Sequence, residues 1–191
     1  MEAQNALGEM YYEGEGVEED YKKAFYWYEK AAEQGHDCAQ CKLGRLYNSG
    51  DGVEKDYKKS IYWYEKAAKQ GYVEAQCRLG RLYYFGLGVE KDYKKAFYWY
   101  EKAADMGNAE GQNKLGKMYC EGEGVERNYK KSFYWYEKAA EQGNYYGQYG
   151  LGRLYYYGAG VNKDYEKAFY WIEKAAKQGY IMAKIALKDW F

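Results

Sequence analysis

Three features of this sequence carry residues that could do chemistry: a cysteine pair, a single histidine and a set of glycine-rich loops. Cys38 and Cys41 form a C-x-x-C, a spacing found in redox and zinc sites, but it occurs once, follows no strand and has no second pair. His36 falls in a turn between repeated segments, so we interpret it as a turn residue. We therefore predict no metal site and no catalytic site.

The loops "GEGVEED" and "GLGVEKD" have glycines that could be taken for a phosphate-binding loop. Such a loop follows a strand and ends in Lys-Ser or Lys-Thr, whereas these glycines recur after a helical pattern throughout the chain. The loops are also too short and too poor in alternating carboxylates for an EF-hand calcium site. We interpret them as turns and predict no cofactor and no enzymatic activity.

The composition excludes several classes of protein. The 191 residues include 29 Lys and Arg and 29 Asp and Glu, which gives no positive field for nucleic acid or an anionic membrane. No apolar run reaches the roughly 20 residues of a membrane-spanning helix. The first residues lack the pattern of a signal peptide, so we expect a cytoplasmic protein, with a secreted form that has lost its leader left open.

A period of 36 residues organises the chain. A leucine recurs at this interval from Leu7 to Leu187, and a tryptophan from Trp27 to Trp171. Self-similarity at this period indicates a solenoid of stacked helical units. The predicted copies and the terminal segment are 3–38, 39–74, 75–110, 111–146, 147–182 and 183–191.

Each copy predicts two helices. In the second copy the first helix is expected over 39–48 and the second over 57–70, because apolar residues recur there at helical spacing. The residues predicted to face inward are Ala39, Leu43, Leu46, Tyr47, Ser60, Ile61, Tyr64, Ala67 and Ala68.

Caps and small residues mark the helix boundaries and contacts. Gly50 and Gly52 predict a turn, Asp56 an N-cap and Gly71 a C-cap. Gly44 lies inside a helix, where glycine costs about 1 kcal/mol relative to alanine, so we expect another helix to approach its backbone closely.

The four cysteines are predicted to be free thiols. Cys41 and Cys77 lie one period apart, and stacked helix pairs are about 10 Å apart, beyond the roughly 7 Å Cα separation that a disulfide tolerates. Free thiols favour a reducing compartment.

The repeated pattern L-G-x-x-Y, G-x-G-V-x-x-D and K-A-x-x-W-Y-x-K-A-A-x-Q-G resembles the Sel-one-like repeat, a relative of the tetratricopeptide repeat. It is carried over the whole chain by residues such as those of the third copy: Leu79, Gly80, Tyr83, Gly86, Gly88, Val89, Asp92, Lys95, Ala96, Trp99, Tyr100, Lys102, Ala103, Ala104 and Gly107. The resemblance implies an all-α, right-handed αα-superhelix, here a single solenoid over 1–191. Five 36-residue helix-turn-helix repeats and a C-terminal capping helix would form this non-enzymatic, protein-binding scaffold or adaptor.

One face of the first helix changes from copy to copy, and positions that change are free to specify a partner. Its three variable positions are offset by four and seven residues, which places them on one face. This variable stripe comprises Asn5, Glu9, Tyr12, Cys41, Arg45, Asn48, Cys77, Arg81, Tyr84, Asn113, Lys117, Cys120, Tyr149, Arg153 and Tyr156. In the superhelix that the chain resembles, this face lines the concave groove. We therefore predict that the groove binds a partner protein or peptide with acidic side chains.

Several alternatives remain open at this stage. The variable stripe could be an ordinary solvated helix face. The chain could be a secreted effector or an inhibitor that clamps a target enzyme. Arginine interleaved with tyrosine could also stack single-stranded RNA, although the neutral total charge argues against it. We expect a monomer or an end-to-end dimer.

Overall fold

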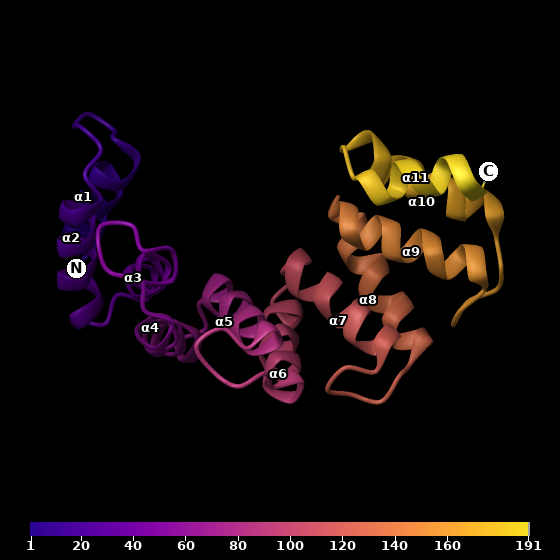
Figure 1. Cartoon of the computed structure of the whole chain (residues 1–191), viewed down its shortest axis with the longest axis horizontal. Coiled ribbons are helices and arrows are strands. Elements are labelled where there is room, and N and C mark those ends of the chain that lie inside the picture. Colours follow the sequence, from indigo (N-terminus) through magenta and orange to yellow (C-terminus); the bar gives the residue numbers. More distant parts are fainter. Residues whose placement is uncertain (191) are drawn as a thin grey trace. The chain divides into compact units, whose positions relative to one another are not determined.

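The computed structural model describes residues 1–190, which form eleven α-helices and no strand within that range. The helices fall into two compact units, shown with their labels in Figure 1. The first unit, Met1–Asp92, contains α1 (Glu2–Glu13), α2 (Tyr21–Glu33), α3 (Asp37–Ser49), α4 (Tyr57–Lys69) and α5 (Val73–Phe85). The second unit begins at Tyr93 and contains α6 (Tyr93–Asp105), α7 (Ala109–Glu121), α8 (Tyr129–Glu141), α9 (Tyr145–Tyr157), α10 (Tyr165–Lys177) and α11 (Ile181–Trp190).

The order of elements confirms the predicted helical solenoid of five copies followed by a C-terminal helix. Odd-numbered helices are the first helix of each copy and even-numbered helices the second. The boundary between the two units falls inside the third copy.

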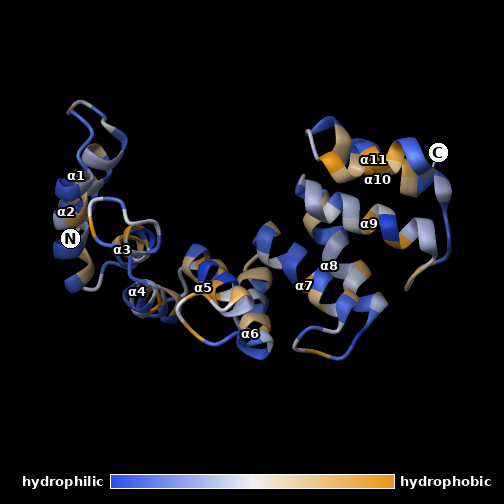
Figure 2. Cartoon of the chain, viewed as in Figure 1, coloured by the Kyte–Doolittle hydropathy of each residue, from blue (hydrophilic) through white to orange (hydrophobic). Residues whose placement is uncertain are grey.

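The second copy shows why these residues form a helix pair. The predicted helices 39–48 and 57–70 correspond to α3 and α4, and every residue predicted to face inward is buried. The spacing of these residues gives each helix one apolar face, and Figure 2 shows the resulting alternation of hydrophobic and hydrophilic residues along the helices. Packing of the two faces against each other forms the core of the copy.

The predicted caps are present, with one shift in position. Oδ1 of Asp56 accepts hydrogen bonds from the backbone N–H groups of Lys58 at 2.9 Å and Lys59 at 3.0 Å. The C-cap of α4 is Gln70, and Gly71, the residue predicted to cap it, follows one residue later with a φ of 91°. The glycine therefore turns the chain just beyond the helix end and not at it.

Replacing Asp56 with alanine should lower the free energy of unfolding by about 1 kcal/mol, because two amide donors at the start of α4 lose their acceptor. Replacing it with asparagine should cost less, since Asn128 already caps the equivalent helix α8 by accepting from the N–H of Lys131. Urea unfolding followed by circular dichroism measures both variants. Equal losses in the two variants would show that the cap is not what Asp56 contributes.

The glycine inside the first helix lies against a large side chain in the first two copies. A Cβ added to Gly44 would be 2.8 Å from Cδ1 of Tyr64, and one added to Gly8 would be 2.6 Å from Tyr28. Both tyrosines are almost fully buried on the second helix of the same copy. The predicted close approach is therefore confirmed, and an aromatic ring makes it.

Glutamine side chains join neighbouring copies, a contact that the repeat pattern does not predict. Nε2 of Gln70 donates to Oε1 of Gln40 at 2.8 Å and to the carbonyl oxygen of Gly35 at 3.0 Å. Nε2 of the buried Gln40 in turn donates to the carbonyl oxygen of Ala32 at 3.1 Å. Within the second unit the same bridge is formed by Gln142 with Gln112, at 2.7 Å, and by Gln178 with Gln148, at 2.8 Å.

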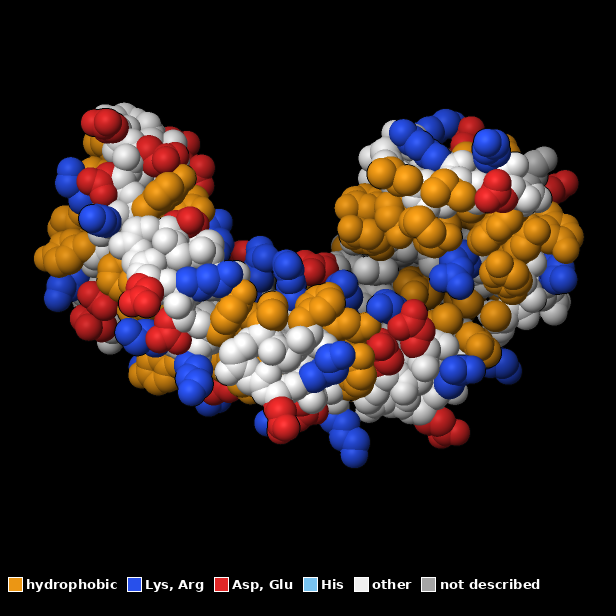
Figure 3. All heavy atoms as spheres, viewed as in Figure 1, with side chains coloured by type: hydrophobic (Ala, Val, Ile, Leu, Met, Phe, Trp, Pro, Cys, Tyr) orange, Lys and Arg blue, Asp and Glu red, His pale blue; other side chains and the backbone are white. Residues whose placement is uncertain are grey.

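The last described helix, α11, has a mixed surface. Its buried residues are Ala183 and Ala186, and Lys188, which replaces the buried glycine of the other copies, is exposed. The side chains of Ile181 and Ile185 are exposed as well, so the polar outer side expected of a capping helix is only partly present. Figure 3 shows hydrophobic side chains gathered over α9 and α11.

Candidate partner-binding site

The residues that could have done redox or metal chemistry are used structurally. All four cysteines lie in the described range and carry thiols. Cys41 is 2% exposed, and burial raises the pKa of its thiol. The hydroxyl of Tyr72 donates to Sγ of Cys38 at 3.4 Å. Within residues 1–190 no cluster of three or more His, Cys, Asp or Glu could hold a metal ion.

His36 is the N-cap of α3. Its Nδ1 accepts a hydrogen bond from the backbone N–H of Ala39 at 3.2 Å, and its Nε2 lies 3.1 Å from Oε2 of Glu2. The predicted turn position is confirmed, and the imidazole acts there as a cap.

The variable stripe of the first unit is largely engaged inside the protein. The thiols of Cys41 and Cys77 are buried, as is the ring of Tyr84. Glu9 forms an ion pair with Lys42 at 2.9 Å.

The stripe's Arg45 is also engaged. It places its guanidinium 4.2 Å from the centre of the Tyr12 ring, and its Nε and Nη2 are buried without a hydrogen-bond partner among the described residues. Three other members of the stripe in this unit, Asn5, Asn48 and Arg81, are partly or fully exposed.

The stripe of the second unit shows the same division. Asn113 is 7% exposed, and Lys117 forms an ion pair with Glu121 at 3.4 Å. Tyr149 packs against Tyr180, with ring centres 5.2 Å apart. The side chains of Cys120, Arg153 and Tyr156 complete the stripe, and the first two line a pocket.

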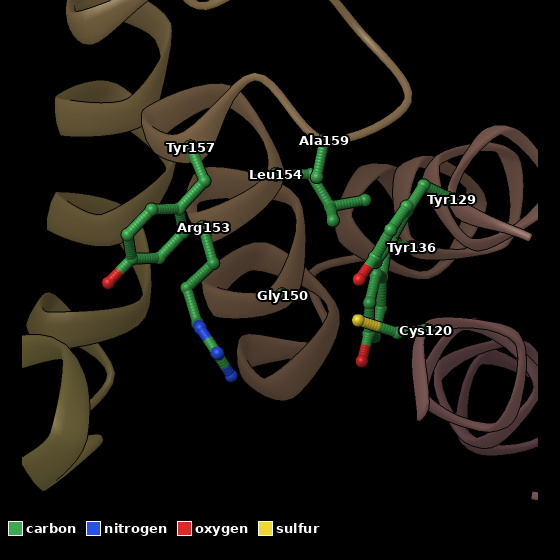
Figure 4. A pocket seen from close by; sticks show the side chains of 8 residues that line it. All are labelled: Cys120, Tyr129, Tyr136, Gly150, Arg153, Leu154, Tyr157 and Ala159. Atoms are coloured by element: carbon green, nitrogen blue, oxygen red, sulfur yellow. The ribbon is translucent and has the colours of Figure 1, made fainter. Parts of the chain in front are cut away.

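This pocket of the second unit lies between the first helices of two successive copies, α7 and α9, and has a volume of about 180 Å³. Figure 4 shows Cys120, Tyr129 and Tyr136 on one side and Arg153 and Tyr157 on the other. Its remaining lining residues are Gly150, Leu154 and Ala159. Burial raises the pKa of the Cys120 thiol, although Arg153 opposes the shift, so the pocket wall carries a neutral thiol near neutral pH.

A second pocket, of about 260 Å³, lies within the first unit. Three of its lining residues, Lys55, Arg78 and Arg81, are cationic, and none is acidic. Arg78 is paired with Glu74 of the same helix at 3.0 Å, and Lys55 lies over the ring of Tyr57 at 4.7 Å. Arg81 is exposed. The other lining residues are Asn48, Ser49, Tyr57, Tyr64, Leu82 and Leu87.

The two pockets are the same place in the repeat, two periods apart. Their equivalent lining residues differ by 72 in number: Asn48 and Cys120, Tyr57 and Tyr129, Tyr64 and Tyr136, Arg78 and Gly150, Arg81 and Arg153, Leu82 and Leu154, and Leu87 and Ala159. The two pockets therefore lie at copies that have Asn48 or Cys120 at the last variable position of the first helix, where the other copies have tyrosine. We name this position the gate position; its residues are Tyr12, Asn48, Tyr84, Cys120 and Tyr156.

Tyrosine at the gate position occupies this space in two copies. The ring of Tyr12 lies 5.2 Å from the ring of Tyr21 and beneath the guanidinium of Arg45. By the same register, Tyr21 is the equivalent of Tyr129 and Arg45 of Arg153.

The ring of Tyr156, in turn, lies 5.3 Å from that of Tyr165 and stacks on Trp190 at 4.3 Å. Tyr165 and Trp190 are the equivalents of Tyr129 and Leu154.

Sequence reasoning missed most of the pocket wall. It named Cys120 and Arg153 but not Tyr129, Tyr136 or Gly150. A signal was available, because the position of Gly150 holds Lys42 in an earlier copy and Arg78 in another, so a long side chain has been lost there.

The comparisons with known proteins agree with this architecture. The fold defines a helical repeat protein of the kind that serves as a non-enzymatic scaffold. The chain belongs to the Sel1 repeat family, whose repeat profile matches residues 2–36, 39–72, 73–108, 109–144 and 146–180. Sel1 repeat proteins generally mediate protein–protein interactions. No curated protein matched the sequence. Of the helices in residues 1–190, none is long and apolar enough to span a membrane.

Solved structures include similar chains. A protective antigen of uropathogenic Escherichia coli that displays an SLR fold is 43% identical, with a TM-score of 0.91 over 95% of this chain. A Sel1 repeat protein from Oxalobacter formigenes is 37% identical, with a TM-score of 0.90, over 95% of this chain and 72% of its own. Cysteine-rich protein B of Helicobacter pylori is 29% identical, with a TM-score of 0.53, over 68% of this chain and 92% of its own. This chain spans 39% of the length of the E. coli antigen.

Proposed function

We propose that this chain binds an acidic segment of a partner protein through the exposed residues of the variable stripe and the pockets beside them. The observation that carries the proposal is the pocket of the first unit, whose wall contains Lys55, Arg78 and Arg81 and no carboxylate. A pocket with this lining attracts a partner carboxylate by charge and donates hydrogen bonds to its oxygens.

Of these cations, Arg81 is the residue most suited to the partner. Arg78 already has a carboxylate partner in Glu74, and Lys55 lies over an aromatic ring. Arg81 is exposed, and a guanidinium can bind a carboxylate through two parallel hydrogen bonds. In the second unit the equivalent Arg153 is also exposed, and its guanidinium lies farther from an aromatic ring, 5.9 Å from the centre of the Tyr149 ring, than Lys55 does.

A library of displayed random peptides, selected on the immobilised chain, tests the proposal even while the partner is unidentified. We expect the selected peptides to be enriched in Asp and Glu. Their affinities, measured by fluorescence anisotropy, should be micromolar, since two or three anchoring contacts of about 1–3 kcal/mol each are available.

Replacing Arg81 and Arg153 together with glutamate should weaken binding of the selected peptides at least tenfold and leave the melting temperature unchanged, because both side chains are exposed. The matched control replaces Lys58 and Lys130 with glutamate. These lysines are exposed and are equivalent in the repeat, and they lie on second helices, outside the variable stripe. Because two cations become two glutamates in both cases, this control has the same total charge as the arginine variant.

Three outcomes contradict the proposal. If the Lys58 and Lys130 variant binds the selected peptides equally weakly, the loss in the arginine variant comes from net charge and not from the stripe. A lower melting temperature in the arginine variant would make the stripe structural. Tight binding of a single-stranded oligonucleotide, with a steep dependence of log affinity on log salt and no competition by acidic peptides, would favour RNA as the ligand.

A further inference from the structure

The pocket beside Cys120 lacks a side chain that other copies supply themselves. At the gate position, Tyr12 and Tyr156 place a ring against the tyrosine that begins the second helix. In the fourth copy this tyrosine is Tyr129, and the residue at the gate position is Cys120. The wall that packs a tyrosine ring elsewhere is therefore retained, while the ring itself is absent.

A second substitution enlarges the same space. Gly150 stands where the second copy has Lys42 and the third has Arg78. A Cβ at Gly150 would be 2.6 Å from Cε1 of Tyr136, so the ring of Tyr136 lies directly over the glycine. Tyr136 is 8% exposed, whereas the equivalent Tyr28 is fully buried, which shows that the pocket uncovers this ring.

The pocket has the size and lining of a receptor for one aromatic ring. Its volume is about 180 Å³, and a cavity of about 150 Å³ lined by apolar side chains holds a benzene molecule. The rings of Tyr129 and Tyr136 and the side chain of Leu154 supply apolar contacts. Arg153 is the equivalent of Arg45, whose guanidinium lies 4.2 Å from the centre of the Tyr12 ring. In this structure the guanidinium of Arg153 lies 5.9 Å from the centre of the Tyr149 ring, a looser contact that a ligand ring in the pocket would replace.

From this we infer that the pocket beside Cys120 binds an aromatic side chain, a tyrosine or phenylalanine, of the partner segment. The ring would take the place that Tyr12 and Tyr156 take in their own copies, against Tyr129 and with Arg153 at its face. This inference rests on the proposed function, because it assumes that the ligand is a protein. It adds an aromatic anchor to the acidic character already proposed.

The test uses p-cresol, the side-chain analogue of tyrosine, and the full chain labelled with ¹⁵N. We expect saturable shifts at the backbone amides around Cys120, Gly150 and Arg153, with a dissociation constant on the order of millimolar for so small a ligand. The saturated analogue 4-methylcyclohexanol should bind at least threefold more weakly, because it has no π-face for the guanidinium. Equal binding of the two would overturn the assignment to an aromatic ring.

The decisive variant replaces Cys120 with tyrosine, the residue of three other gate positions. The new ring should fill the pocket, raise the melting temperature and weaken p-cresol binding at least tenfold. The matched control replaces Asn48 with tyrosine, which alters the gate position of the first unit and should leave p-cresol binding unchanged. Undiminished binding to the Cys120 variant, or shifts that lie elsewhere, would overturn the inference.

The failure of this inference and that of the proposed function give different results. If acidic peptides bind the chain but contain no aromatic residue, or if changing their aromatic residue to alanine does not weaken binding, only the aromatic anchor is refuted. If p-cresol binds at Cys120 and no acidic peptide is selected, the pocket assignment stands and the acidic partner is refuted.

Discussion

Replacing Gly52 with alanine is expected to lower the free energy of unfolding by about 2–5 kcal/mol, from left-handed backbone strain of roughly 1–2 kcal/mol and overpacking of roughly 1–3 kcal/mol. Gly52 has a φ of 70°, and a Cβ there would strike the backbone carbonyl of Tyr21 and approach the nitrogen of Lys22 to 2.8 Å. These atoms belong to the start of the second helix of the preceding copy, so neither can move without shifting α2. The glycine is needed because two copies stack at this point.

Gly71 provides the matched control for the Gly52 variant. Its φ of 91° is also left-handed, but a Cβ at this position would meet nothing within 4 Å. Alanine at Gly71 should therefore cost only the backbone strain, about 1–2 kcal/mol. Urea unfolding of both variants gives the comparison, and similar losses would mean that the contact with Tyr21 contributes nothing to stacking.

Replacing Gln40 with leucine is expected to destabilise the chain by about 2 kcal/mol, although leucine is the more apolar residue. Gln40 is 4% exposed and connects Ala32 of the first copy to Gln70 of its own copy. Leucine removes two hydrogen bonds, the one that Gln40 donates to Ala32 and the one that it accepts from Gln70, and each contributes about 1 kcal/mol. The carbonyl oxygen of Ala32 then keeps the backbone N–H of Gly35 as its donor, at 3.0 Å.

The control for the Gln40 variant replaces Gln70 with methionine. Gln70 is exposed, and the third copy carries Met106 at this position, where Oε1 of the equivalent Gln76 is buried without a hydrogen-bond partner among the described residues. The change puts Oε1 of Gln40 in the same state but keeps its bond to Ala32, so it should cost about 1 kcal/mol, less than the Gln40 variant. Thermal and urea unfolding measure both variants. A larger loss at Gln70 than at Gln40 would place the stabilising contact at the surface of the bridge and not at its buried end.

The helices and their caps could be predicted because each depends on residues close in sequence. Asp56 precedes an apolar run and caps the helix that this run forms. Gly44 is a residue of low helix propensity inside a helix, and the ring of Tyr64 packs against it there. Such patterns follow from helix periodicity and from the four unpaired amides at each helix start.

The burial of part of the variable stripe could not be read from spacing alone. Offsets of four and seven residues show that Cys41 and Arg45 share a helix face, but not how far the next first helix covers that face. The buried Cys41 is close enough to Glu74 and Arg78 of α5 for their charges to act on the pKa of its thiol. The variable stripe is therefore in part a contact between successive first helices, and its role in binding a partner remains a prediction.

The pockets could not be predicted from the sequence for a related reason. The wall of each pocket combines residues 30 apart, such as Cys120 and Gly150, whose meeting depends on how one copy lies on the next. The 36-residue period does not give this offset. Once the offset is known, loss of tyrosine at the gate position together with loss of a long basic side chain identifies the more apolar pocket directly.

The residue at the gate position, in our interpretation, decides whether the space between successive first helices is filled or open to a ligand. A crystal structure of the variant with Cys120 replaced by tyrosine is the sharpest test of this interpretation. We expect the new ring to lie against Tyr129 with the guanidinium of Arg153 at its face, and the pocket to be closed. A ring that points into solvent above an open pocket would show that the gate position does not control this space.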